Sequence, residues 1–529
     1  MNSNSRTYNS YRNFSMAITQ KIVSIFLTFF GRMVFLRVLS VEYLGISNVF
    51  ASVLGLLTMA DLGLSTAITY SYYKPIAEKD EQKLAALSFF YKRTFNIIGA
   101  AIAVIGLALT PFIGMIINVE NPIPHIEIYF LLYLVNVVIS YLVVHKVLII
   151  TADQNKHIVT KYNMWMSVFN TILRIAVLLI TGSFMIYCLV VIITKSIYNI
   201  LISRKANKLY PFIKNGQNRA KRDFAFCEEH IPTKKVKLAA ADKRAVFQNM
   251  KSAMILKFAN VFLSGTDNFF ISVLIGTAMV GKYVNYFLAV SSLNQFGYIV
   301  FRSLSASIGN VVATESPEKR LQIFKTMQTA SCWIGGFFCF CLFFLLDDFV
   351  ALWLGREFVF DPFTKIIILL NLYLSIAMHP IAAFREATGM FQKTKLAMVA
   401  AAVLKVVLAI VLGMLFGLPG ILAANFLAGV LTYAWYEPKI LFRDFLHVGA
   451  VGYLIGHVLN LILLMSLIAG IYFLLPWFID TPENLSWLEW LIKGVVCTIL
   501  INAVYLLRYF KTPEFRIIKD KTIGFIKRG

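Results

Sequence analysis

Long apolar stretches run through this chain almost from end to end, separated by short polar turns. About 20 apolar residues suffice for a helix to cross the hydrocarbon core of a bilayer. Because the stretches are continuously apolar and lack a ten-residue alternation, they favour spanning helices over strands. We place fourteen spans, at residues 18–38, 43–72, 87–117, 126–151, 159–181, 184–203, 249–275, 279–311, 320–346, 363–385, 395–416, 419–437, 449–476 and 486–508.

The composition agrees with this reading. Of the 529 residues, 59% are hydrophobic and only 15% are charged, and the mean hydropathy is +0.72. A soluble domain of this size does not have such a composition. We therefore expect an all-α integral membrane protein.

The chain also carries an internal duplication. The segment LRIAVL at 173–178 returns as LKVVLA at 404–409, and FLRVL at 35–39 returns as FISVL at 270–274. This register makes Arg174 equivalent to Lys405, and Arg32 equivalent to Asp267. Two halves of one architecture imply a cavity between them, as in transporters built from repeats.

We expect five segments from these patterns. They are a first lobe at 1–203, a basic linker at 204–248, a second lobe at 249–437, two further spanning helices at 438–508, and a basic tail at 509–529.

The distribution of basic residues predicts the orientation. Lysine and arginine occur in every loop on the side of the N-terminus, whereas the opposite loops, which include Asp347 and Asp348, are mostly acidic. The positive-inside rule then places both termini in the cytoplasm. Much of the net charge of +23 lies in the linker and the tail, where it suits adhesion to anionic lipid and requires no nucleic acid. Regulation or partner binding by the linker is the alternative.

Four charged residues are predicted deep within the spans: Arg32, Arg174, Asp267 and Lys405. A charge at the bilayer centre costs roughly 2.5–3.5 kcal/mol on insertion scales, and such residues usually face a bundle interior or a water-filled path. We interpret the four as lining a central cavity, with an internal salt bridge as the competing explanation. Three of them end polar stripes at helical spacing, which are Lys21, Ser24, Thr28 and Arg32; Asn163, Ser167, Thr171 and Arg174; and Lys257, Asn260, Ser264 and Asp267.

Asp61 and Arg302 lie nearer the ends of their spans. Either could form a gate, a coupling-ion site or an ion pair between the lobes. His379, beside Pro380, is interpreted as an interior histidine. We identify no catalytic motif, no metal site and no cofactor motif; the phosphate-loop spacing at 276–283 has a tyrosine where a hydroxyl residue would bind magnesium.

Short motifs at residues 43–46 (YLGI), 60–64 (ADLGL), 351–355 (ALWLG), 388–391 (TGMF) and 417–424 (GLPGILAA) give the chain a recognisable order. In that order and placement it resembles bacterial polysaccharide flippases of the Wzx type, in the multidrug/oligosaccharidyl-lipid/polysaccharide (MOP) exporter superfamily. The resemblance covers the whole chain. It implies two pseudo-symmetric six-helix lobes, as in MATE transporters, and two extra C-terminal helices that pack outside and form a groove for a polyprenyl tail.

The function that the resemblance implies is transport, not enzymatic catalysis. Such a flippase moves undecaprenyl-pyrophosphate-linked oligosaccharide across the bacterial cytoplasmic membrane by alternating access, for O-antigen or capsule biosynthesis. Its partners would be membrane lipids, H⁺ or Na⁺, a polysaccharide polymerase and a chain-length regulator. Arg32, Arg174 and Lys405 would then offset the charge of the diphosphate, and Asp61 and Asp267 would be candidates for the coupling ion.

Two alternatives remain open. A multidrug or cation antiporter of the same superfamily would share the fold but would favour carboxylates and aromatic side chains in its cavity. A membrane-embedded polysaccharide polymerase or ligase would need a substantial polar outward loop, whereas the longest such connection here, at about 346–362, is short and largely apolar.

Overall fold

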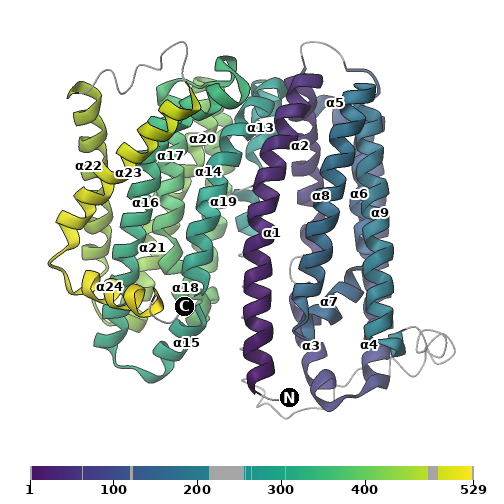
Figure 1. Ribbon diagram of the computed structural model, residues 1–529, viewed down its shortest axis with the longest axis horizontal. Coiled ribbons are helices and arrows are strands. Elements are labelled where there is room, and N and C mark those ends of the chain that lie inside the picture. Colours follow the sequence, from purple (N-terminus) through teal and green to yellow (C-terminus); the bar gives the residue numbers. More distant parts are fainter. Residues whose placement is uncertain are drawn as a thin grey trace. The chain divides into compact units, whose positions relative to one another are not determined.

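The computed structural model describes residues 3–61, 64–119, 123–213, 255, 258–263, 265–303, 305–474 and 486–526. All the regular secondary structure in these ranges is helical, as the apolar stretches predict. The described residues belong to two compact units (Figure 1). The first comprises residues 1–250 and 276–281, and the second comprises residues 251–275 and 282–529.

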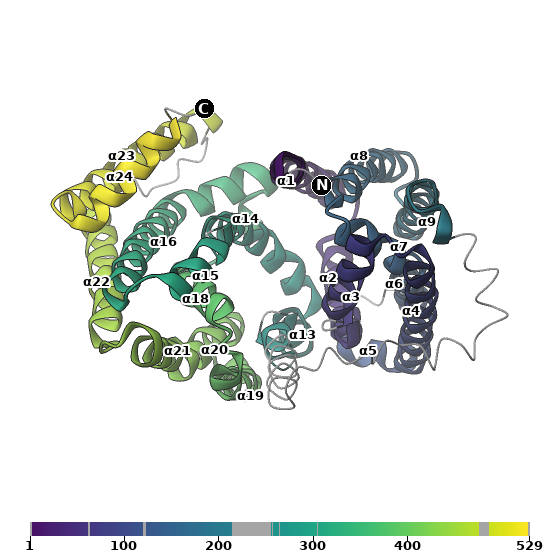
Figure 2. The same ribbon diagram turned by 90° about the horizontal axis from the view of Figure 1, so that it is seen from below.

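The first unit contains α1 to α9. Their bounds are α1 (Ser3–Val38), α2 (Val41–Leu57), α3 (Leu64–Glu78), α4 (Glu81–Leu109), α5 (Ile113–Ile116), α6 (Ile126–Tyr141), α7 (Val144–Ala152), α8 (Lys156–Thr181) and α9 (Phe184–Leu209). Helix α1 packs along α8, and α8 packs along α9 (Figures 1 and 2). These two contacts bring the charged positions of the first and fifth predicted spans onto neighbouring helices.

The second unit contains the remaining described helices, except for the first turn of α14. Their bounds are α13 (Asp267–Leu274), α14 (Thr277–Ser303), α15 (Ser305–Thr314), α16 (Pro317–Leu354), α17 (Pro362–Ala377), α18 (His379–Thr388), α19 (Phe391–Phe416), α20 (Leu418–Leu431), α21 (Tyr433–Leu441), α22 (Val451–Leu474), α23 (Trp487–Tyr509) and α24 (Pro513–Ile526). A short π-helix, η4, spans Phe442–Leu446.

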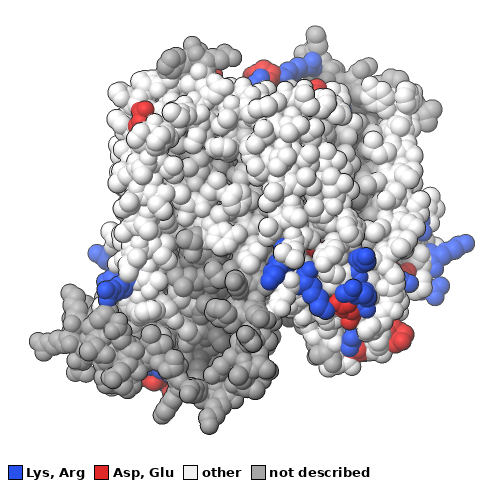
Figure 3. All heavy atoms as spheres, turned by 180° about the vertical axis from the view of Figure 1, so that it is seen from behind, with Lys and Arg blue, Asp and Glu red and all other residues white. Residues whose placement is uncertain are grey.

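Within the described residues, nine helical segments are long and apolar enough to cross a membrane, and the bent pair of α6 and α7 could form a tenth. The predicted spans 18–38 and 279–311 are helical too, in α1 and in α14 with α15, while part of 249–275 lies outside the described residues. On the described part of the face drawn in Figure 3, charged atoms gather toward the two ends and the middle is uncharged. This pattern is the one expected of a multi-pass membrane protein.

Several predicted spans differ from the structure. The stretch 43–72, predicted as one span, is interrupted by a 3₁₀ turn at Thr58–Asp61. A continuous helix of that length would measure about 45 Å, well beyond a hydrocarbon core of about 30 Å. Asp347 and Asp348, predicted in an outward loop, instead lie inside α16, where each is paired with a lysine.

A proline break separates α17 from α18 and places His379 at the junction. Pro380 has no N–H with which to satisfy the carbonyl of Ile376. The Ser331 hydroxyl, from α16, donates to that carbonyl at 2.9 Å, and the Tyr453 hydroxyl, from α22, donates to the carbonyl of Ala377 at 3.0 Å. The exposed backbone of the break is therefore satisfied by neighbouring helices, which is how broken helices persist in membranes.

Helices α22 and α23 lie on the outside of the second unit, in agreement with the expectation for the last two spans (Figure 2). A buried ion pair joins Lys493 of α23 to Asp348 of α16, with 2.7 Å between Nζ and Oδ2. A second polar contact centres on Asn460 of α22, which donates to the Tyr373 hydroxyl and accepts a hydrogen bond from the Tyr505 hydroxyl, both at 3.0 Å. These contacts fix the two outer helices to α16 and α17.

The C-terminal tail, predicted only as basic, contains the amphipathic helix α24. Phe515 of this helix stacks on Trp333 of α16, with ring centroids 6.0 Å apart and an angle of 17° between the planes. Trp333 also stacks on Tyr505 of α23. The aromatic contacts dock the tail against the second unit.

Candidate functional site

Lys405 and Asp267 form an ion pair inside the second unit. Nζ of Lys405, on α19, lies 2.7 Å from Oδ1 of Asp267, the first residue of α13. The lysine side chain is fully buried, and it also donates to the backbone carbonyl of Leu263. The two residues thus form an internal salt bridge, and Asp267 also lines a cavity that is described below.

Their equivalents in the first half of the chain are both cations. Arg32 lies on α1 and Arg174 lies on α8, and the two helices pack together. The close approach is visible at Gly31, where a Cβ atom would lie 3.4 Å from Cγ2 of Thr171. In the second unit, α13 and α19 carry an ion pair with no net charge. The equivalent helices of the first unit, α1 and α8, carry two basic residues.

Arg174 is held against an aromatic ring. Its guanidinium carbon lies 4.1 Å from the centre of the Tyr187 ring, on α9. The Nε atom is buried, and no hydrogen-bond acceptor reaches it among the described residues. A stacked guanidinium keeps its edge available, and that edge is the part that binds carboxylate or phosphate oxygens.

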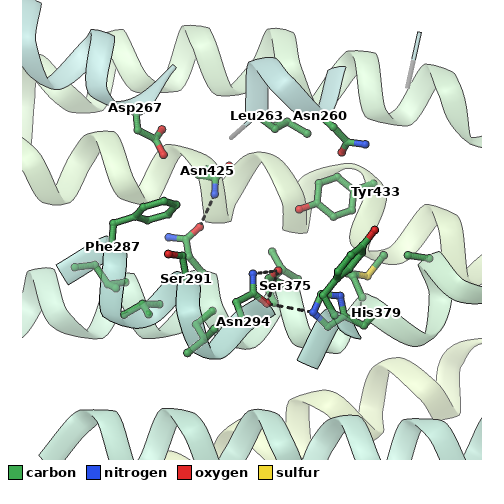
Figure 4. Close-up of a pocket in the computed structure, with 18 of the residues that line it drawn as sticks. Asn260, Leu263, Asp267, Phe287, Ser291, Asn294, Ser375, His379, Asn425 and Tyr433 are labelled. Carbon is green, nitrogen blue, oxygen red and sulfur yellow. Dashed lines mark hydrogen bonds between the residues drawn. The ribbon is translucent and has the colours of Figure 1, made fainter. Parts of the chain in front are cut away.

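The second unit also contains a partly open cavity of about 430 Å³ (Figure 4). This volume falls within the range typical of small-molecule sites, about 300–1,000 Å³. The polar and aromatic side chains that line it are Asn260, Asp267, Tyr283, Phe287, Ser291, Asn294, Tyr298, Asn371, Ser375, His379, Arg385, Asn425, Tyr433 and Glu437.

Two amide clusters face this cavity. In the first, Asn294 donates to the Ser375 hydroxyl at 3.0 Å, and the amide oxygen of Asn294 lies 3.1 Å from Nε2 of His379 (Figure 4). In the second, Asn425 of α20 donates to the amide oxygen of Asn371 of α17 at 2.8 Å. The interior position predicted for His379 is thus a position on the cavity wall.

A second ion pair forms part of the cavity wall. Arg385 of α18 donates to Glu437 of α21, with 2.6 Å between Nη1 and Oε1. The Glu437 side chain is 1% exposed. Glu437, the last residue of the predicted span 419–437, was not among the site residues predicted from the sequence.

The structure describes the other predicted positions only in part. Asp61 ends the 3₁₀ turn and Arg302 lies near the end of α14, but their side chains are outside the described part of the chain. Lys257 and Ser264 of the third polar stripe are also outside it. Asn260 of that stripe lines the cavity with Asp267. No group of three or more potential metal ligands occurs among the described residues.

Comparison with known proteins gives matches among solved structures alone. No protein-family model and no curated protein sequence matches the chain. The structure of a lipid II flippase, MurJ, in an inward closed conformation matches with a TM-score of 0.64 and 13% identity, covering 94% of this chain and 99% of that one.

MATE transporters match with lower scores. An inward-facing multidrug resistance MATE family transporter of the MOP superfamily gives a TM-score of 0.54 at 13% identity, covering 81% of this chain and 98% of that one. A MATE structure in complex with MaL6 gives 0.50 at 13% identity, covering 82% and 96%. These likenesses concern the fold. The chain is therefore an all-α, multi-pass membrane protein with the transporter fold that is also found in a lipid II flippase and in MATE transporters.

Proposed function

We propose that this protein is a flippase that moves undecaprenyl-pyrophosphate-linked oligosaccharide units across the bacterial cytoplasmic membrane for surface polysaccharide biosynthesis. The observation that carries the proposal is Arg174, a cation on a membrane-embedded helix whose Nε atom has no acceptor among the described residues. Likeness of fold to a lipid II flippase supports the same class of transport.

The chemistry of the substrate suits this residue. A diphosphate loses its hydration when it leaves the membrane surface, and a guanidinium replaces part of that hydration through two parallel hydrogen bonds. The Tyr187 ring holds Arg174 by its face. In the proposal, Arg32 on the adjacent α1 contributes a second positive charge to the same anionic headgroup.

Lys405 and Asp267 have a different part in this proposal. Because they neutralise each other, the second unit presents no net charge at the positions where the first unit presents two cations. In the proposed binding set, Arg32 and Arg174 bind the diphosphate. Asp267 faces the cavity, and Lys405 holds the Asp267 carboxylate in place.

Transport is proposed to follow alternating access, driven by an H⁺ or Na⁺ gradient, with both termini in the cytoplasm. Asp61 and Arg302 remain candidates for the coupling-ion site or for a gate. A polysaccharide polymerase and a chain-length regulator are the proposed protein partners, and the basic linker and tail are proposed to lie against anionic lipid.

A cation antiporter is the second candidate, and the second-unit cavity argues against it. A site for a cationic drug needs a carboxylate that is available to the drug. Asp267 and Glu437, the two carboxylates that line this cavity, are already paired with Lys405 and Arg385. A polymerase or ligase is the less favoured third candidate, since the similar solved structures reported above are of a flippase and of transporters.

The test is complementation in a bacterial strain that lacks its own flippase, with two readouts. Surface polysaccharide is measured together with the lipid-linked repeat unit that accumulates in the cytoplasmic leaflet. The proposal predicts that export returns and that accumulation falls. If accumulation persists in strains with several different repeat units while the protein is present in the membrane at normal abundance, the flippase assignment is wrong, and drug-efflux assays would follow.

A further inference from the structure

We propose that the cavity in the second unit binds the sugar part of the substrate, and that it selects an uncharged, polyhydroxylated glycan. This inference rests on the proposed function, because it assigns a site to one portion of the lipid-linked molecule. It concerns residues that the sequence motifs did not select, chiefly Asn294, Asn371, Asn425 and Tyr433.

The carboxylates that line the cavity are neutralised by basic partners. Asp267 is compensated by Lys405, and Glu437 is compensated by Arg385. The lining therefore carries paired charges in place of a free cation or a free carboxylate, as far as the described residues go. A strongly charged ligand would lose hydration in the cavity without gaining an unpaired counter-ion. An uncharged ligand would not incur this cost.

The cavity wall is rich in side chains that both donate and accept hydrogen bonds. Sugar hydroxyls both donate and accept, and amide and hydroxyl side chains are their natural partners because they do the same. The cavity has four asparagines and two serines on its wall: Asn260, Asn294, Asn371, Asn425, Ser291 and Ser375.

Some of this capacity is still available. Asn425 donates to Asn371, but its own amide oxygen accepts no hydrogen bond from any described residue. The same holds for the Tyr433 hydroxyl, which points into the cavity in Figure 4. These two half-buried polar groups on one cavity wall have unused hydrogen-bonding capacity, which a hydroxylated ligand would satisfy.

The cavity wall has apolar aromatic faces and an amide that is fixed by hydrogen bonds. The aromatic side chains of Phe287 and Tyr433 supply apolar faces against which the C–H face of a sugar ring can pack (Figure 4). Asn371 is fixed by two bonds from its amide nitrogen, to the carbonyls of Ile367 and Leu422, each at 3.0 Å. The hydrogen-bonding surface is thus held in place before a ligand arrives, which lowers the entropic cost of binding.

The first experiment measures sugar binding directly, independently of transport. Full-length protein in lipid nanodiscs is titrated with lactose, maltose and N,N′-diacetylchitobiose by saturation-transfer NMR, with glucuronic acid as the charged comparison and empty nanodiscs as the background. We expect saturable binding of at least one uncharged disaccharide and weaker binding of glucuronic acid. Asn425→Leu and Tyr433→Phe should each weaken it roughly two- to twelvefold, the effect of one neutral hydrogen bond.

The matched control is Asn502→Leu, which removes an asparagine of the same unit that bonds to Trp333, outside the cavity. It should leave sugar binding unchanged. Binding that survives both cavity substitutions, or tighter binding of glucuronic acid than of every uncharged probe, would overturn the inference.

A second experiment tests the cavity through export, which does not require measurable binding of free sugars. Ala382→Phe places a ring into the cavity, whereas Ala400→Phe places the same ring on the exposed side of α19. In a complemented strain, the first should reduce export and the second should not; equal export by the two variants would refute a sugar site here.

If disaccharides bind but complementation fails, the flippase proposal fails and the cavity assignment stands. If complementation succeeds and Ala382→Phe is silent, only the cavity assignment fails.

Discussion

Lys405 Nζ lies 2.7 Å from Asp267 Oδ1, at the two positions where the first half of the chain has Arg174 and Arg32. The equivalent helix pairs therefore differ in charge between the two halves. In the second unit the two charges cancel, whereas both equivalent positions of the first unit are basic. This asymmetry is the main structural support for an anionic substrate.

The Lys405–Asp267 pair predicts a strong effect of losing one partner. Lys405→Met leaves a largely buried carboxylate without its counter-ion, so the variant should lose roughly 3–5 kcal/mol of stability. The double variant Lys405→Met with Asp267→Asn should recover most of that loss because no charge remains. Thermal unfolding of detergent-solubilised protein measures both. A double variant as unstable as the single one would show that the pair does not act as a unit.

Arg174 should matter for export more than for folding. Arg174→Gln removes the charge and the guanidinium edge but keeps a polar side chain, and we expect export to fall roughly ten- to hundredfold, the value of one or two charge-assisted hydrogen bonds. Arg174→Lys keeps the charge without the planar fork and should be intermediate. Surface polysaccharide, normalised to protein abundance, is the readout.

Lys195→Gln is the matched control for this series. Lys195 is also a cation above an aromatic ring of the first unit, with its Nζ 5.2 Å from the centre of the Tyr198 ring, but it does not lie at a duplicated charge position. Export should remain close to wild type. A normal level of export by Arg174→Gln, at normal abundance, would remove the central support for the proposed function.

The two outer helices should depend on the Asp348–Lys493 pair. Lys493→Met leaves Asp348, whose side chain is 2% exposed, without its partner, and should lower the unfolding temperature clearly. Lys511→Met, at an exposed position just beyond α23, is the control and should have little effect. The comparison is made by thermal unfolding in the same detergent. If both substitutions are equally mild, the pair does not hold α23 to α16.

Gly336 permits the close approach of α16 and α23. A Cβ atom at this position would lie 1.7 Å from Oη of Tyr505, so Gly336→Ala should be severely destabilising. Adding Tyr505→Leu removes the obstructing ring and should restore part of the stability. Gly494→Ala, whose new methyl would meet its nearest atom at 3.7 Å, should be tolerated. A stable Gly336→Ala single variant would mean that the helices are not so closely packed.

The sequence predicted many of the residue positions in the candidate site, but it did not predict the contacts between their side chains. The duplicated register already related Arg174 to Lys405 and Arg32 to Asp267. It did not show that Lys405 would point at Asp267 and Leu263, because that depends on the rotation of α19 against α13. Glu437 was overlooked because an ionisable residue at the end of a span resembles an interfacial one until its partner, Arg385, is seen.

By itself, the sequence determined the all-helical membrane architecture and the approximate spans. These properties follow from local hydropathy, since a helix in lipid satisfies its own backbone hydrogen bonds and needs only a sufficient apolar length. Tertiary structure decided which charges are neutralised, where the helices break, and that asparagines from α14, α17 and α20 converge on one cavity. Those outcomes depend on how separate helices pack against one another, and side-chain partners that are distant in the sequence are chosen only when that packing is complete.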